Sequence, residues 1–179
     1  MSESVNPKEG GSIDPKAGGT INPKEIFTAP IQVGVLVKDL DGYLKKLDPI
    51  FGIGPFRIAD YPPVDELPFR EYHGKEGNFK AKFCFYEMGN IQLELIQPLA
   101  GESIWQDFID THGPGIHHLK FSVPDHEVVG QYLKENGYEI SQQGAAVGPN
   151  KGRVWAFYPT YDDIGFDVEL MNELPKQDN

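Results

Sequence analysis

An internal duplication is the feature that most constrains how this chain can fold. Residues 32–39 read QVGVLVKD and residues 118–125 read HLKFSVPD, and the two segments match position for position. Each is a β-rich apolar run that ends in an aspartate, a residue that often caps the start of a helix. The match places Gln32 opposite His118. We therefore expect two modules that fold alike.

A second pair of matching segments lies near the end of each half. LELI at 93–96 matches VELM at 168–171, which places Glu94 opposite Glu169. In a strand, each glutamate lies on the face opposite to its immediate apolar neighbours. A buried ionised carboxylate is costly unless it is paired or binds a metal, so two such glutamates beside a histidine suggest a divalent cation. The pattern alone is equally consistent with two glutamates that face solvent.

Hydrophobic periodicity predicts the order strand, helix, strand, strand, strand in each half. Asp39 and Asp125 should cap the two helices, and Pro49 together with residues 52–55 should end the first one. The predicted strands are 31–37, 56–61, 80–88, 91–97, 118–123, 138–143, 153–159 and 165–171, and the predicted helices are 40–51, 126–136 and a linking helix near 103–113. The modules then cover about residues 31–98 and 115–172.

The first 24 residues differ from the rest of the chain. Residues 1–24 repeat an eight-residue unit, with Pro7, Pro15 and Pro23 in register. Each unit offers one Val or Ile, which buries too little apolar surface to offset the backbone entropy lost on ordering. We expect a flexible tail over 1–24 and a single domain over 25–179. The polar stretch at 62–78 is long for a connection and is expected to shape the mouth of a site.

Charge excludes two classes of partner. Among 179 residues, 16 Lys and Arg stand against 27 Asp and Glu, which gives a net charge of −11. That sign is wrong for nucleic acid and for anionic membranes. No run reaches the roughly 20 apolar residues of a membrane-spanning helix, and a soluble cytoplasmic protein is expected. The single cysteine, Cys84, has no partner for an internal disulfide and is expected to be a buried apolar side chain.

Four separated segments carry a resemblance to a known family. QVGVLVKDLD, MGNIQLELIQPLAGES, GPGIHHLKFSVPD and FDVELMNE occur in this order and resemble the vicinal-oxygen-chelate superfamily, most of all methylmalonyl-CoA epimerase and its relatives. The resemblance covers about residues 31–172. It implies an α+β fold in which two βαβββ modules form an open, U-shaped mixed sheet around one divalent metal. The ligands it implies are Gln32, Glu94, His118 and Glu169.

Several positions depart from these families. Epimerases of the superfamily usually have His where this chain has Gln32, and a Gln there is more similar to glyoxalase I. Leu36 and Pro98 stand where glyoxalase I holds the glutathione moiety with Arg and Asn, which argues against glutathione conjugates as substrates. Phe83 stands near the position of the epimerases' second base, which argues against a strict epimerase.

The chemistry that the resemblance implies is proton transfer next to a carbonyl. One divalent ion (Co, Mn, Ni, Zn or Mg) would chelate adjacent oxygens of a substrate and stabilise an enolate. Glu169 is the preferred base and Glu94 the second candidate, because a carboxylate in an apolar cup has a raised pKa. We expect an isomerase, epimerase or lyase that acts on a small acyl-CoA or oxo-acid and forms a homodimer.

Two other functions remain open. One is a metal-free drug-binding protein that resembles bleomycin-resistance proteins. The other is an extradiol-type dioxygenase, which needs two histidines and a carboxylate around iron and is disfavoured by Gln32.

Further side chains have structural and functional readings. His117 should point to the face opposite to His118 and away from the site. Residues 148–153, with Lys151 and Arg153, are either a solvated turn or an anion-binding loop. Four aromatic residues on predicted strands either line the cup or belong to the core: Tyr61, Phe85, Trp155 and Tyr158.

Overall fold

A computed structural model describes residues 21–172 of the chain. Most of the expected tail, residues 1–20, lies outside the described residues. Residues 21–24 lead into the short helix α1 (Pro23–Ile26), whose N-cap Asn22 accepts a hydrogen bond from the backbone N–H of Lys24. Ile21 and Ile26 pack into an apolar cluster around Phe121. The last copy of the repeated unit is thus attached to the domain.

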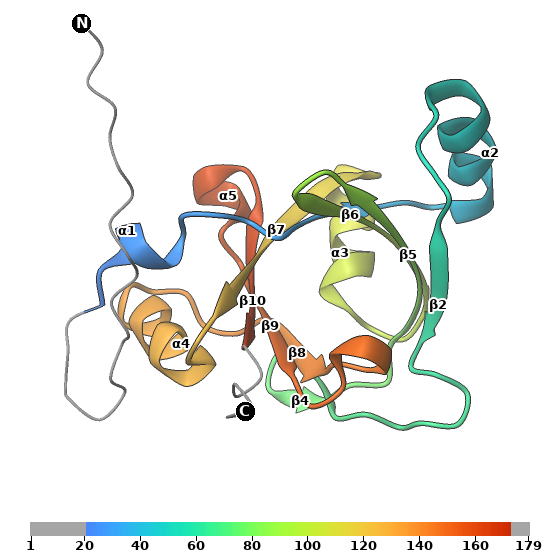
Figure 1. Cartoon of the computed structure of the whole chain (residues 1–179). Coiled ribbons are helices and arrows are strands. Elements are labelled where there is room, and N and C mark those ends of the chain that lie inside the picture. The colour runs from blue at the N-terminus through green and yellow to red at the C-terminus, as the bar shows by residue number, and fades with distance from the viewer. Residues whose placement is uncertain (1–20, 173–179) are drawn as a thin grey trace, which may run out of the picture.

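One mixed sheet of ten strands curls into a half-barrel and dominates the structure (Figure 1). Its order is β2-β5-β6-β1-β7-β10-β9-β8-β3-β4. The strands are β1 (Gln32–Leu36), β2 (Arg57–Tyr61), β3 (Arg70–Tyr72), β4 (Lys75–Glu76), β5 (Lys80–Met88), β6 (Ile91–Ala100), β7 (Gly115–Val123), β8 (Gln142–Ala145), β9 (Val154–Tyr158) and β10 (Asp167–Asn172). The α+β fold with an open, U-shaped sheet is confirmed.

The two halves meet in the middle of this sheet. β1 and β7 pair antiparallel, and each pairs on its other side with the last strand of its own half, β6 or β10, in parallel. The first and last strands of both halves therefore form four adjacent strands at the centre. The duplication seen in the sequence corresponds to this arrangement.

The helices that follow α1 are α2 (Leu40–Phe51), α3 (Ile104–His112), α4 (His126–Glu135), α5 (Tyr161–Ile164) and a 3-10 turn at Gly148–Asn150. α3 lies within the curl of the sheet (Figure 1), where Trp105 belongs to the same apolar cluster as Trp155 and Phe157. Asp39 and Asp125 cap α2 and α4 as predicted, each accepting hydrogen bonds from backbone N–H groups of the first turn. None of the helices in the described residues is long and apolar enough to cross a membrane.

Helix α2 ends at Phe51 as predicted, although Pro49 lies inside its last turn: Gly52, in the left-handed conformation, donates to Asp48 O, and Ile53 donates to Leu47 O. One predicted strand boundary was wrong. The strand predicted at 138–143 begins only at Gln142, because Tyr138 N–H donates to Leu133 O at the end of α4 instead of joining the sheet.

The segment 62–69, which we call the strap, joins the two ends of the sheet. It leaves β2, the first strand in the sheet order, and enters β3, which pairs with β8 near the other end. Phe69 O accepts from Ala145 N–H at 2.9 Å, and Tyr61 Oη donates to Ala145 O at 3.1 Å. The long polar stretch of the sequence is therefore partly a strap and partly the β3–β4 hairpin.

Candidate metal centre

Three of the predicted ligands meet on the concave side of the central strands. His118 Nε2 on β7 lies 3.3 Å from Glu94 Oε2 on β6 and 3.1 Å from Glu169 Oε2 on β10. One ligand atom from each residue lies within 4.8 Å of the others, and all three side chains are buried. β6, β7 and β10 are three of the four central strands, with β1 between β6 and β7, and this arrangement brings the three groups together.

Gly34 makes the space in which His118 lies. In the register of the sheet, Gly34 on β1 stands between Glu94 on one side and His118 on the other. A Cβ atom at Gly34 would lie 1.8 Å from Cε1 and 2.1 Å from Nε2 of the His118 ring. The ring therefore crosses the β1 backbone at the one residue without a side chain, which lets it reach Glu94.

Gln32, the fourth predicted ligand, is also buried and lines the same cavity as the two glutamates. Its Nε2 donates to Oε1 of Gln92, its register partner on β6, at 2.5 Å. That bond leaves Gln32 Oε1 buried without a hydrogen-bond partner among the described residues. The hydrogen bond to Gln92 thus orients the carboxamide of Gln32 so that its Oε1 is directed away from Gln92.

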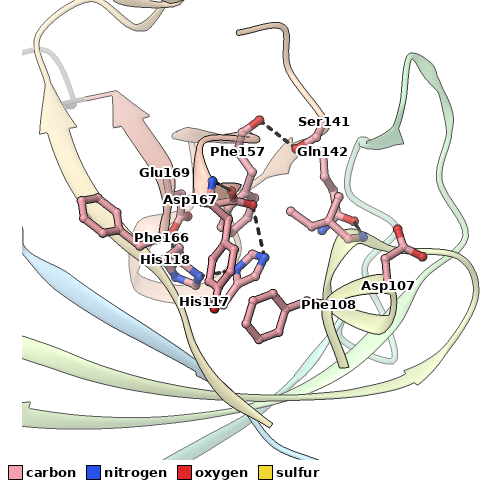
Figure 2. A network of polar contacts seen from close by, with 12 residues as sticks. Asp107, Phe108, His117, His118, Ser141, Gln142, Phe157, Phe166, Asp167 and Glu169 are labelled. Carbon is pink, nitrogen blue, oxygen red and sulfur yellow. Dashed lines mark hydrogen bonds and ion pairs between the residues drawn. The ribbon is translucent and has the colours of Figure 1, made fainter. Parts of the chain in front are cut away.

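The prediction for His117 was wrong, and the reason is a β-bulge. Gly34 pairs with His118 but the next residue, Val35, pairs with Ile116, so His117 is the extra residue of β7. At a bulge the strict alternation of side chains is lost. His117 is buried on the same side as His118, and the two Nδ1 atoms lie 3.0 Å apart (Figure 2).

His117 links His118 to a carboxylate. His117 Nε2 lies 3.4 Å from Asp167 Oδ2, and Asp167 Oδ1 accepts from the backbone N–H groups of Thr160 and Tyr161. Burial and the neighbouring rings lower the pKa of His117 well below its ordinary value, which keeps its ring neutral. With Nε2 of His118 facing the glutamates, its Nδ1–H donates to His117, whose Nε2–H then faces Asp167. Such outer contacts fix a ligand histidine's tautomer and orientation.

Lys120 is a site residue that the sequence reasoning missed. It lies two residues after His118, between Gln32 and Glu169 in the register of the sheet. The side chain is buried, and Nζ lies 3.1 Å from Glu169 Oε1. The signal was present, since residues two apart in a strand share a face.

The charges at the site support one another electrostatically. Burial disfavours ionisation of Glu94, but the Lys120 ammonium and the His118 ring outweigh it and hold the pKa of Glu94 below its ordinary value. Burial likewise opposes the charge on His118, yet Glu169 and Glu94 raise the pKa of this ring. The same two carboxylates outweigh the burial of Lys120 and raise its pKa.

The donor set fits a divalent cation. Three buried atoms at the site have no hydrogen bond within the described part of the chain: Gln32 Oε1, His118 Nε2 and Glu169 Oε2. Buried polar atoms normally have hydrogen-bond partners, and a bound ion is a usual explanation when they do not. One imidazole nitrogen with carboxylate and amide oxygens suits borderline or hard divalent metals such as Zn, Ni, Co, Mn or Mg.

A cavity of about 450 Å³ opens above these residues. Three of the four aromatic residues that could line the cup do line this cavity: Tyr61, Phe85 and Trp155. The fourth, Tyr158, packs instead in the apolar cluster around Phe121. Phe83 also lines the cavity. Its walls are therefore largely aromatic and its base is polar, an arrangement typical of small-molecule sites.

Two segments form the rim of the cavity. Pro63, Val64 and Asp65 of the strap face residues 146–150 across it. Lys151 Nζ forms an exposed ion pair with Glu66 Oε1 at 2.9 Å. The turn expected at 148–153 is thus part of the mouth, with its lysine bound to the strap.

Family comparison agrees with the fold. Residues 31–157 match the model of the Glyoxalase/Bleomycin resistance protein/Dioxygenase superfamily. The chain belongs to this superfamily. YqjC, an uncharacterized protein of Bacillus subtilis (strain 168), is 30% identical over 140 residues, which span 76% of this chain and 98% of YqjC.

Solved structures show the same fold at low identity. A hypothetical protein from Bacillus halodurans C-125 is 23% identical, with a TM-score of 0.54 over 84% of this chain and 98% of its own. Methylmalonyl-CoA epimerase from Mycobacterium tuberculosis is 22% identical, with a TM-score of 0.56 over 83% and 89%. A methylmalonyl-CoA epimerase in complex with methylmalonyl-CoA and NH4+ is 17% identical, with a TM-score of 0.56 over 84% and 97%.

Proposed function

We propose that this protein is a divalent-metal-dependent enzyme that moves a proton at a carbon next to a carbonyl, as an isomerase, epimerase or lyase does. The observation that carries the proposal is the buried cluster of Glu94, His118 and Glu169, with the unbonded Oε1 of Gln32 beside it, at the base of a largely aromatic cavity. These four residues are the proposed ligands. A divalent ion bound there supplies Lewis-acid stabilisation for the oxygen of an enolate.

Glu169 is the proposed base, with Glu94 as the second candidate. Glu169 lines the cavity and carries one oxygen near His118 and the other near Lys120. In the step we propose, the C–H bond next to the carbonyl breaks, Glu169 takes the proton, and the electron pair of that bond forms the enolate. The protonated Glu169 then returns the proton to carbon or to a leaving group.

The remaining residues set the conditions for this step. Phe83, Phe85, Trp105 and Trp155 exclude water from the cavity walls, which strengthens electrostatic interactions inside it. His117 with Asp167 orients His118, and Gln92 orients Gln32. Both orienting groups act through a ligand and not on a substrate.

A small acyl thioester or oxo-acid is the proposed substrate class. Two structural neighbours support this: one methylmalonyl-CoA epimerase is described in complex with methylmalonyl-CoA, and the Streptomyces coelicolor enzyme in complex with 2-nitronate-propionyl-CoA. A cavity of about 450 Å³ is large enough for the reacting end of such molecules. We also propose a homodimer, the state expected from the open sheet.

The first test is elemental analysis of protein purified without chelator, with His118→Ala and Glu169→Ala prepared in the same way. Near-stoichiometric metal that both substitutions abolish is expected, and Glu139→Gln, an exposed change, should retain it. Loaded protein is then screened with acyl-CoA and oxo-acid compounds for exchange of the substrate C–H with solvent deuterium. Glu169→Gln should abolish exchange while the fold persists. Wild-type protein that takes up no metal, even after reloading, would favour a metal-free binding protein.

A further inference from the structure

We propose that Lys120 binds a negatively charged oxygen of the substrate and makes the site selective for anionic ligands. The inference deepens the proposed function, because it rests on a ligand that occupies the cavity above Gln32, Glu94 and Glu169. It assigns a specificity role to a residue that is not among the proposed metal ligands.

The first argument is the hydrogen-bonding capacity of Lys120. Its ammonium group carries three donors, and Glu169 Oε1 at 3.1 Å is the one partner that residues 21–172 give it. The side chain is only 7% exposed, yet it lines the cavity. A buried donor without a partner is costly. A ligand oxygen in the cavity supplies the partner that the protein does not.

The second argument is charge balance at the base of the cavity. Glu94 and Glu169 carry two negative charges and Lys120 one positive charge, all three buried. A divalent cation brings the sum at this base to a net positive charge in a desolvated place, which an anionic ligand neutralises. Arg57 lines the same cavity as a second cation. The carboxylates of Asp60 and Asp65, which also line it, are exposed to solvent.

The third argument comes from the duplication. In the match between the two halves, Lys120 stands opposite Gly34, so the same place in the fold is filled in one half by a lysine and in the other by a glycine. The strand geometry thus does not require a long side chain there. A glycine is needed at position 34 because the His118 ring fills the space of its side chain. We attribute the lysine at position 120 to the ligand that occupies the cavity.

The test compares two ligands that differ at one end by a methyl group and by the negative charge that it removes. Oxamate and its methyl ester carry the same two adjacent oxygens, but only oxamate is an anion. Binding of both to metal-loaded protein is measured by calorimetry for wild type and Lys120→Met. Wild type should prefer oxamate, in part because its carboxylate also binds the metal, and Lys120→Met should reduce that preference by at least about tenfold, the contribution of one hydrogen bond to a charged group, with its metal content unchanged.

Matched variants identify the cause. Lys120→Arg should keep the preference, since it keeps the charge. Arg57→Met tests general electrostatics in the cavity and should reduce the preference less, because Arg57 is exposed and lies over the Phe85 ring. Lys80→Met, on the exposed side of β5, should change nothing. If Lys120→Met lowers the folded fraction, Lys120→Gln gives the same readout with a polar neutral head.

The outcomes separate this inference from the proposed function. Lys120→Met that prefers oxamate as strongly as wild type does, in protein with normal metal content, overturns the role of Lys120 and leaves the proposed function intact. Wild-type protein that binds no metal overturns the proposed function. Oxamate binding by the metal-free wild type and Lys120→Met then decides the role of Lys120 on its own.

Discussion

Substitution of Gly34 by alanine tests the packing on which the candidate metal centre depends. The added Cβ would lie 1.8 Å from Cε1 of His118, and the ring would have to retreat by roughly 1.5 Å to restore ordinary contact. Metal–ligand distances tolerate only roughly 0.2 Å. We therefore expect Gly34→Ala to lower metal affinity by at least about 100-fold, the upper end of the effect of losing an orienting contact.

The assay has two parts. Metal affinity is measured by competition with a chromophoric chelator, and the free energy of unfolding of the metal-free protein by urea titration. Overpacking should cost about 1–3 kcal/mol of stability in the metal-free protein. Gly115→Ala is the matched control, because Gly115 lies on β7 and a Cβ there meets open space.

A double-mutant cycle makes the reasoning refutable. His118→Ala removes the ring with which the new methyl group would clash, so Gly34→Ala should cost little further stability in the His118→Ala background. The explanation is wrong if Gly34→Ala binds metal as wild type does. It is also wrong if the loss of stability is the same with and without the His118 ring, because the strain would then lie elsewhere.

Three further expectations concern buried titratable groups. Asp167→Asn should weaken metal binding by about 10- to 100-fold by chelator competition, whereas Asp163→Asn, which removes a charge at the exposed contact with Tyr138, should not. Metal affinity should fall as the pH is lowered, because a proton competes with the metal for His118. The pKa of His118 is raised in the metal-free protein, so its charge stabilises that protein at low pH, and this stabilisation disappears as the pH rises through the raised pKa; unfolding titrations of both forms check the two effects. Burial raises the pKa of Cys84 to about 11, so its reaction with a thiol reagent should require unfolding.

The fold was accessible from the sequence because its main signals are repeated. The match of residues 32–39 with 118–125, and of Glu94 with Glu169, places equivalent strands in equivalent positions, and those strands became the four at the centre of the sheet. Helix caps are equally local, since Asp39 and Asp125 act on their own first turns. Matching segments and helix caps can both be recognised in the sequence without knowing which distant residues come into contact.

The site was only partly accessible, because its details depend on irregular backbone. A bulge in β7 places His117 on the same face of the sheet as His118, and no pattern in the sequence predicts a bulge. Alternation was reliable elsewhere and pointed to Lys120, but a lysine in a strand is ordinarily interpreted as solvent-exposed. Only the packed structure shows that this lysine is buried beside Glu169.

The strap has a consequence for the size of the molecules that the protein can distinguish. Because residues 62–69 tie the first strand of the sheet to β3 near its other end, the half-barrel cannot widen without breaking the β3–β8 pairing. The covalent chain of the strap therefore limits the width of the half-barrel. In the function we propose, a long carrier attached to the substrate would lie outside the strap, and the cavity would select among the small groups that enter it.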